Sequence, residues 1–418
     1  MSLTELNRAG LPDGGADAAR PRKLPLAALL ALATAVFITS LTETLPAGLL
    51  PAMSGDLGVG ESAAGQTVTV YALGTVLTAI PLSAATARWR RRKLLLTTVL
   101  GFALANTVTA LSPYYPLTMV ARFAAGVAAG LAWALLAGYA RRMAPAHLEG
   151  RAIAVAMAGI PVALSLGVPA GTFVGKVVGW QVAFLVMTGL TVVLVGWIMA
   201  AVPDYPGQIA EKGVKGEKRA KGGSSSMRAA LKAPGVPPVL LVTLVFVLAH
   251  TILYTYIATF LDGLGMGGQT DVVLLVFGGA SLLSIWAVGV LINRRLRALM
   301  VAGSLLVAVA GALLALLSGA PGLVYVAVVL WGLGWGGAPT LLQTAAGDAG
   351  GEQADAAQAM LVTLWNVAMA GGGVAGGLLL DALGTMALPW SAVGLMVPVV
   401  IVVLVARTHG FPARRDGS

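Results

Sequence analysis

One polar segment decides the fold: PDYPGQIAEKGVKGEKRAKGGSSSMRAALKAPGVPP, residues 203–238. It is the only long polar stretch inside a chain of 418 residues in which 58% are hydrophobic and 11% are charged. No soluble core buries so large an apolar share, so the lipid bilayer is the expected solvent.

Apolar runs on both sides of this segment are long enough to cross a bilayer, which takes about 20 residues in a helix. Twelve runs are expected to span, six before the segment and six after it: 24–50, 64–87, 94–111, 117–140, 152–174, 181–202, 237–260, 271–292, 298–317, 323–345, 359–382 and 388–406. The sequence therefore predicts an all-α membrane protein of twelve transmembrane helices. The expected organisation is a tail (1–23), an N-terminal six-helix bundle (24–202), a linker (203–236), a C-terminal six-helix bundle (237–406) and a second tail (407–418).

The basic residues are distributed unevenly over the loops of this topology. Of the 27 Lys and Arg, 25 fall on the side of the termini, Lys176 falls on the other side, and Arg122 lies within a span. The positive-inside rule then predicts that both termini are cytoplasmic and that the protein lies in the cell (inner or plasma) membrane. Topology also accounts for the +10 net charge, so no nucleic-acid partner is expected.

The residue types needed for metal binding and for catalysis are missing or scattered. The chain has no Cys, and its three His are far apart, so neither a metal site nor a cofactor is expected. No HExxH, GxSxG or phosphate-binding loop occurs, so we do not expect an enzyme.

Internal similarity indicates that the two halves are parallel repeats. At an offset of 205 residues, four positions at the end of the fifth span match four at the end of the eleventh: Gly167, Gly171, Lys176 and Gly179 with Gly372, Gly376, Asp381 and Gly384. Parallel repeats joined by a basic linker are the layout of transporters whose halves rock about a central site.

Several motifs resemble those of one transporter family. They are TETLPAGLLPAMSGDLGV (42–59), AAGQTVTVYALG (63–74), MVARFAAGVAAG (119–130), LSLGVPAGTFVG (164–175) and HTILYTYIATFL (250–261). Over residues 24–406 the chain is similar to the major facilitator superfamily, in particular the twelve-span drug:proton antiporters that include sugar-efflux and chloramphenicol-efflux exporters. The resemblance implies two six-helix bundles and proton-coupled export.

The loop after the second span departs from the family pattern of a Gly, an Asp-Arg pair and Gly-Arg-Arg. It reads SAATARWRRRK (83–93), with Ser83, Ala87 and Arg90 at the first Gly, the Asp and the second Gly. A gate that depends on that Asp is therefore in doubt, and the basic cluster can equally serve as a topology anchor.

An acid and a base within the spans are the strongest functional signal. Glu43 lies in the first span and Arg122 in the fourth, both expected roughly 10 Å below the outer end of their helices. A charge in hydrocarbon costs roughly 2.5–3.5 kcal/mol on insertion scales, so it needs a partner, water or a proton. We expect proton coupling through Glu43 with Arg122 tuning it; the alternatives are a permanent Glu43–Arg122 bridge, or a loop position for Glu43 if the span ends at Pro46.

Other polar and aromatic residues in the spans are candidates to line a substrate cavity. They are Asn106, Trp133, His250, Tyr254, Tyr256, Gln343, Trp365 and Asn366. Helix packing is the alternative for His250 and for the two tyrosines, and a place in the headgroup belt for the tryptophans.

Span 5 carries small residues at four-residue spacing together with a proline: Gly167, Pro169, Gly171 and Gly175. This pattern predicts a kinked helix that packs closely on a neighbour, and the resemblance links it with export. Close packing alone is the alternative.

Few charges in the spans favour neutral or weakly polar cargo. The expected function is a proton-coupled antiporter that exports small, largely apolar or neutral molecules such as antibiotics, and the alternative is a proton-coupled sugar or metabolite exporter. The expected partners are a small-molecule substrate, protons and the lipid bilayer, and the chain is expected to be a monomer.

Overall fold

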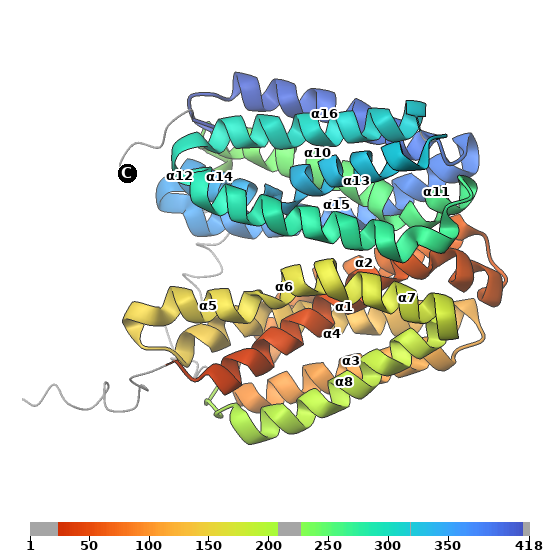
Figure 1. Cartoon of the computed structure of the whole chain (residues 1–418). Coiled ribbons are helices and arrows are strands. Elements are labelled where there is room, and N and C mark those ends of the chain that lie inside the picture. The colour runs from red at the N-terminus through yellow and green to blue at the C-terminus, as the bar shows by residue number, and fades with distance from the viewer. Residues whose placement is uncertain (1–23, 208–226, 318, 413–418) are drawn as a thin grey trace, which may run out of the picture.

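The computed structural model describes residues 24–207, 227–317 and 319–412, and these residues fold almost entirely as helices. The helices pack in two bundles, one above the other in Figure 1. The tail 1–23, most of the predicted linker and the last residues of the second tail lie outside the described part.

The first bundle contains the helices that precede the linker. They are α1 (Leu26–Leu57), α2 (Glu61–Ala85), α3 (Arg91–Leu111), α4 (Tyr115–Arg142), η1 (Ala146–Leu148), α5 (Glu149–Met157), α6 (Gly159–Val162), η2 (Ala163–Gly167), α7 (Val168–Val178) and α8 (Trp180–Ala201).

The second bundle contains the helices that follow the linker. They are α10 (Val236–Thr255), α11 (Ile257–Gly263), η3 (Gly267–Gln269), α12 (Thr270–Leu317), α13 (Pro321–Gly336), α14 (Ala338–Gly350), η4 (Gly351–Gln353), α15 (Ala354–Leu383) and α16 (Ala387–Val405).

Twelve spans result when the long helical stretches are divided. Among the described residues, nine stretches are long and apolar enough to cross a membrane, and two of them, Gly267–Leu317 and Pro321–Leu383, are long enough for two crossings each. Non-helical backbone at Arg295 (φ −140°, ψ 33°) divides α12 into spans 8 and 9. With α2 as the remaining span, the all-α arrangement of twelve helices predicted from the sequence is confirmed.

The first span is longer than predicted. Helix α1 continues through Pro46 and Pro51 and ends at Leu57 rather than near residue 50, with Gly58 in the left-handed conformation (φ 64°) as its cap. The alternative in which the span stops at Pro46 is therefore wrong, and Glu43 lies well inside a continuous helix.

Span 5 is irregular, as its glycines and prolines predicted. It runs as α5, α6, a π-helical turn at Ala163–Gly167 and α7. Methyl groups added at Gly167, Gly171 or Gly175 would collide with Phe37, Leu45 or Leu49 of α1. The four-residue spacing thus lets α7 lie directly on α1.

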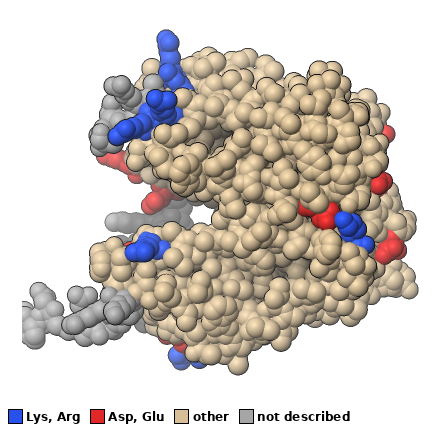
Figure 2. Space-filling model, viewed as in Figure 1, with Lys and Arg blue, Asp and Glu red and all other residues tan. Residues whose placement is uncertain are grey.

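The two bundles touch at the end of the molecule where α8 begins, and part at the end where α8 finishes and α10 begins (Figure 1). We call these the closed end and the linker end. Figure 2 shows the surface hollowed between the bundles at the linker end and continuous at the closed end.

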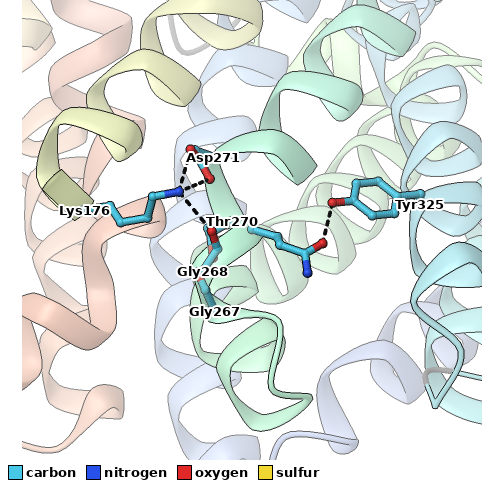
Figure 3. Close-up of polar contacts among 7 residues, drawn as sticks. Lys176, Gly267, Gly268, Thr270, Asp271 and Tyr325 are labelled. Carbon is cyan, nitrogen blue, oxygen red and sulfur yellow. Dashed lines mark hydrogen bonds and ion pairs between the residues drawn. The ribbon is translucent and has the colours of Figure 1, made fainter.

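Polar contacts hold the closed end together along two seams. Along α2 and α15, Gln66 Nε2 donates to the Gly373 carbonyl at 3.2 Å and Thr69 Oγ1 donates to the Ala370 carbonyl at 3.3 Å. Along α7 and α12, Lys176 Nζ lies 3.0 and 2.9 Å from the two Asp271 carboxylate oxygens and donates to the Gly268 carbonyl at 2.9 Å (Figure 3).

Inside the first bundle, α4 crosses α2 closely at Gly126. A methyl group at Gly126 would collide with the Tyr71 carbonyl, whereas Gly138 on the same helix has no atom within 4 Å of the added carbon. We expect Gly126→Ala to lose about 1–3 kcal/mol to overpacking and Gly138→Ala to lose nothing. Thermal unfolding in detergent measures both, and equal midpoints would contradict the packing described.

The role of Lys176 at the closed end can be tested by cysteine labelling, because the sequence contains no natural cysteine. A single reporter, Thr69→Cys, replaces a side chain that is 4% exposed between the bundles. We expect Lys176→Gln to speed maleimide labelling of this reporter about fivefold, the factor that about 1 kcal/mol gives for a half-exposed ion pair. Lys176→Arg keeps the charge and is the control; labelling no faster in the Gln variant than in the Arg variant would refute a holding role for the ion pair.

Candidate functional site: an acid and a base in one bundle and an aromatic cluster in the other

Arg122 of α4 is fully buried and only partly satisfied. Its Nε donates to the Thr67 carbonyl at 3.3 Å, while Nη1 and Nη2 have no hydrogen-bond partner among the described residues. The guanidinium carbon lies 5.0 Å from the centre of the Tyr71 ring and 6.0 Å from that of Phe184. Aromatic faces stabilise a desolvated cation by roughly 0.5–2 kcal/mol each, less than the cost of burying an unpaired charge.

Glu43 of α1 lies in the same bundle and within electrostatic reach of Arg122 and Tyr71. Its side chain is half-buried, and its carboxylate forms no ion pair or hydrogen bond with any residue in the described ranges. The permanent Glu43–Arg122 bridge considered from the sequence is therefore not formed in this structure.

Neighbouring polar groups extend this layer across the bundle. Asn106 Nδ2 of α3 donates to Thr42 Oγ1 at 3.1 Å, and Asn106 Oδ1 is enclosed without a partner in the described structure. The Tyr71 hydroxyl donates to the Thr39 carbonyl at 3.1 Å. Three buried polar atoms, two on Arg122 and one on Asn106, thus keep an unused hydrogen-bonding capacity that water, a proton carrier or a ligand can satisfy.

The second bundle presents aromatic rings instead of charges. We call seven residues the ring cluster: Phe246, His250, Tyr254, Phe277, Trp331, Trp335 and Trp365. His250 is its centre, with its ring stacked 3.4 Å from the centre of Trp335 and its Nδ1 accepting from Trp331 Nε1 at 3.2 Å. Three of the predicted cavity residues, His250, Tyr254 and Trp365, therefore lie in one cluster.

Tyr256 lies apart from these rings. It is fully buried where the bundles meet, and its hydroxyl donates to the Gly373 carbonyl at 2.8 Å. The Gly65 and Gly376 positions leave room for its ring, since a methyl group at either would collide with it. Tyr256 therefore belongs to the closed end, at the seam between α2 and α15.

The remaining cavity candidates are more peripheral. Trp133 is half-buried in the core of the first bundle. Gln343 is exposed, and its carbonyl accepts from Gln358. Asn366 donates to the Val362 carbonyl within its own helix at 2.9 Å. Among the described residues, no hydrogen bond or ring contact joins these three to the ring cluster or to Arg122.

Three residues that contact Lys176 or Arg122 were not predicted by the sequence analysis. Asp271 was missed although Lys176, the lone cation on its side, signalled that an acidic partner was needed. Tyr71 and Thr67 carry no signal of their own, because their part is set only by the crossing of α2 and α4.

Asp204, just after α8, holds the basic loop that departs from the family pattern. Its carboxylate lies 2.6 Å from Arg90 Nε and accepts from the Arg92 backbone amide at 3.2 Å. An acid from the start of the linker thus pairs with the loop in which Ala87 stands at the family's Asp position.

Comparison with known proteins agrees with this architecture. Residues 32–373 match the family model described as Major Facilitator Superfamily. A bacterial homologue of the human lysosomal transporter Spinster, solved in an inward-facing and unoccupied conformation, superimposes with a TM-score of 0.69 at 13% identity, covering 95% of this chain and all of that one.

Relatives with assigned names are similar over most of their length. They include the transcription regulatory protein OpdE of Pseudomonas aeruginosa (30% identical, 91% of this chain and 94% of the relative), the chloramphenicol efflux pump Rv0191 of Mycobacterium tuberculosis (30%, 88% and 89%) and the purine ribonucleoside efflux pump NepI of Escherichia coli K12 (27%, 88% and 91%). With a family model that spans most of the chain, a twelve-helix fold in two bundles and efflux pumps among its relatives, the chain belongs to the major facilitator superfamily and is a membrane transporter, not an enzyme.

Proposed function

We propose that this transporter is a proton-coupled antiporter that exports small, neutral or largely apolar molecules, antibiotics among them, by alternating access. The observation that carries the proposal is the pair of Glu43 and Arg122, which share a bundle without forming an ion pair in the described structure. An acid and a base that lie unpaired in a membrane interior are expected to take part in proton exchange, which a permanent ion pair would prevent.

Proton exchange at Glu43 follows from the balance of two effects. Burial favours the neutral carboxyl group and the Arg122 charge favours the carboxylate, so a small change in either shifts the balance. Opening one end of the molecule and then the other changes the hydration of Glu43, so the proton taken up on one side can be released on the other. Arg122 tunes this exchange through its charge.

The shape of the molecule supports a cycle that loads substrate from the cytoplasm. By the positive-inside rule, the linker end is cytoplasmic in the cell membrane, and the hollow between the bundles opens there (Figure 2). The Lys176–Asp271 pair and the Tyr256 seam close the opposite end. Export then requires this end to open when the linker end closes.

The chemistry of the spans supports uncharged cargo. The ring cluster offers stacking surfaces, and none of its seven members is acidic or permanently charged. Two relatives are named as pumps for molecules that combine a ring with polar groups, chloramphenicol and purine ribonucleosides. The nucleoside pump also favours the second candidate, a proton-coupled sugar or metabolite exporter.

Replacement of Glu43 separates proton coupling from the movement of substrate itself. In inverted vesicles with an acidic lumen, we expect Glu43→Gln to abolish uptake driven by the pH gradient while leaving exchange of substrate across equal pH intact, because the neutral amide can neither gain nor lose a proton. Glu61→Gln at the start of α2 removes another half-buried acid and is the matched control. Gradient-driven uptake at the wild-type rate in Glu43→Gln would remove Glu43 from the coupling mechanism.

The substrate is identified by expression in an efflux-deficient host screened against antibiotics, nucleosides and sugars, with Glu43→Gln as the inactive reference. Raised tolerance to chloramphenicol-like drugs favours drug export, and reduced accumulation of nucleosides or sugars favours the metabolite alternative.

A further inference from the structure

His250 is held in one tautomer by its neighbour. An indole N–H can only donate, so the bond from Trp331 Nε1 to His250 Nδ1 requires a lone pair on Nδ1. The ring proton must then sit on Nε2, and the imidazole is uncharged. In this geometry His250 is a fixed hydrogen-bond donor that points away from Trp331.

The donor that results has nothing to bind within the protein. Nε2 forms no hydrogen bond to any residue of the described ranges, where the contact to Trp331 is the one hydrogen bond of this ring. One turn further along α10, the Tyr254 hydroxyl is also enclosed without a partner among the described residues. The two rings are neighbours, with centroids 5.2 Å apart.

The rings around these two groups differ in exposure. Phe246, Phe277 and Trp331 are at most 1% exposed and form the floor of the ring cluster, while His250 and Trp335 are each 8% exposed and Trp365 is half-buried. His250, with its unpartnered donor, therefore stacks on Trp335, and Trp335 in turn contacts Trp365, the least buried ring of the cluster. A histidine used only for packing would be expected to have both nitrogens satisfied.

We propose that the ring cluster is a binding site for an uncharged substrate that carries an aromatic ring with a hydrogen-bond acceptor at its edge. This inference rests on the proposed export function and names its substrate class. The ring stacks beside Trp335 and Trp365, His250 Nε2–H donates to the acceptor, and the Tyr254 hydroxyl bonds a second polar group. Trp331 is a positioning residue, because it acts only by keeping the proton of His250 on Nε2.

The His250 donor opposes the binding of lipophilic cations, although aromatic faces alone attract them. A cation next to His250 would face the positive end of an N–H bond, and no member of the ring cluster supplies a carboxylate to compensate it. Neutral ring compounds should therefore bind with clearly lower dissociation constants than cations of similar size.

The test measures dissociation constants of the purified full chain by calorimetry, with chloramphenicol and adenosine as neutral ring probes and tetraphenylphosphonium as the cation. We expect binding of at least one neutral probe, and at least tenfold weaker binding of that probe in His250→Phe, which keeps the ring but loses the donor. His250→Gln, which restores an N–H near Nε2, should recover most of the affinity. His409→Phe, at an exposed position outside the spans, is the control.

Two further variants keep the test decisive if His250→Phe does not fold. Tyr254→Phe removes one oxygen atom and should weaken the same probe severalfold. Trp331→Phe frees Nδ1 and should give an intermediate loss, together with a change in the imidazole nitrogen NMR signals that simple loss of packing would not produce.

The outcomes separate this inference from the proposed function. Wild-type affinity for the neutral probes in His250→Phe or Tyr254→Phe, or binding of tetraphenylphosphonium with neither neutral probe, overturns the ring-cluster site. If binding depends on His250 as expected while no pH gradient drives uptake, the site stands and proton-coupled export is refuted.

Discussion

A bilayer supplies no hydrogen bonds, and this constraint governs the whole molecule. Every backbone group within the membrane must be satisfied by its own helix, which is why the described chain is helical nearly throughout. The constraint applies equally to side chains, so a polar atom without a partner in the spans is costly. Among the described residues, the buried side-chain atoms without a partner lie on Arg122, Asn106, Thr172, Tyr254 and Thr259. Those on Arg122, Asn106 and Tyr254 fall in the candidate site, where we expect function rather than stability to have shaped the fold.

The two repeats have divided the chemistry between them. In the first bundle, Arg122 lies among Thr67, Tyr71 and Phe184, with Glu43 close by. In the second bundle, the offset of 206 residues that pairs Gly126 with Gly332 places Val328 at the position of Arg122, and the rings around His250 take the place of charge. The first bundle thus carries titratable groups where the second carries stacked aromatic rings. Protons and uncharged cargo can then be handled by different halves of one molecule.

The sequence predicted the features that depend on composition and residue spacing. It missed those that depend on where helices distant in the chain cross each other. Span number, the two halves and the irregular fifth span follow from apolar length, a polar linker and small residues four apart, and the structure contains all three. The predicted end of the first span at residue 50 was too early, because α1 continues through Pro46 and Pro51, packed on α7, and ends at Leu57. Asp271 and Tyr71 act only through helices far away in the chain, so no local pattern marks them. The ring cluster was foreseen as scattered candidates; that Trp331 orients His250 became visible only in three dimensions.

The fifth span connects the two ends of the proposed cycle in space. Its glycines let α7 lie on the part of α1 that bears Glu43, and the last turn of α7 carries Lys176, the residue that joins the bundles at the closed end. Close-packed interfaces move as units rather than deform, so a shift of α1 that follows protonation must be accommodated by α7. The lysine at its tip holds Asp271 through an exposed ammonium group, a contact weak enough to be exchanged during turnover. The small-residue packing of α7 on α1 is thus a short mechanical connection between Glu43, the proposed proton site, and the ion pair at the closed end.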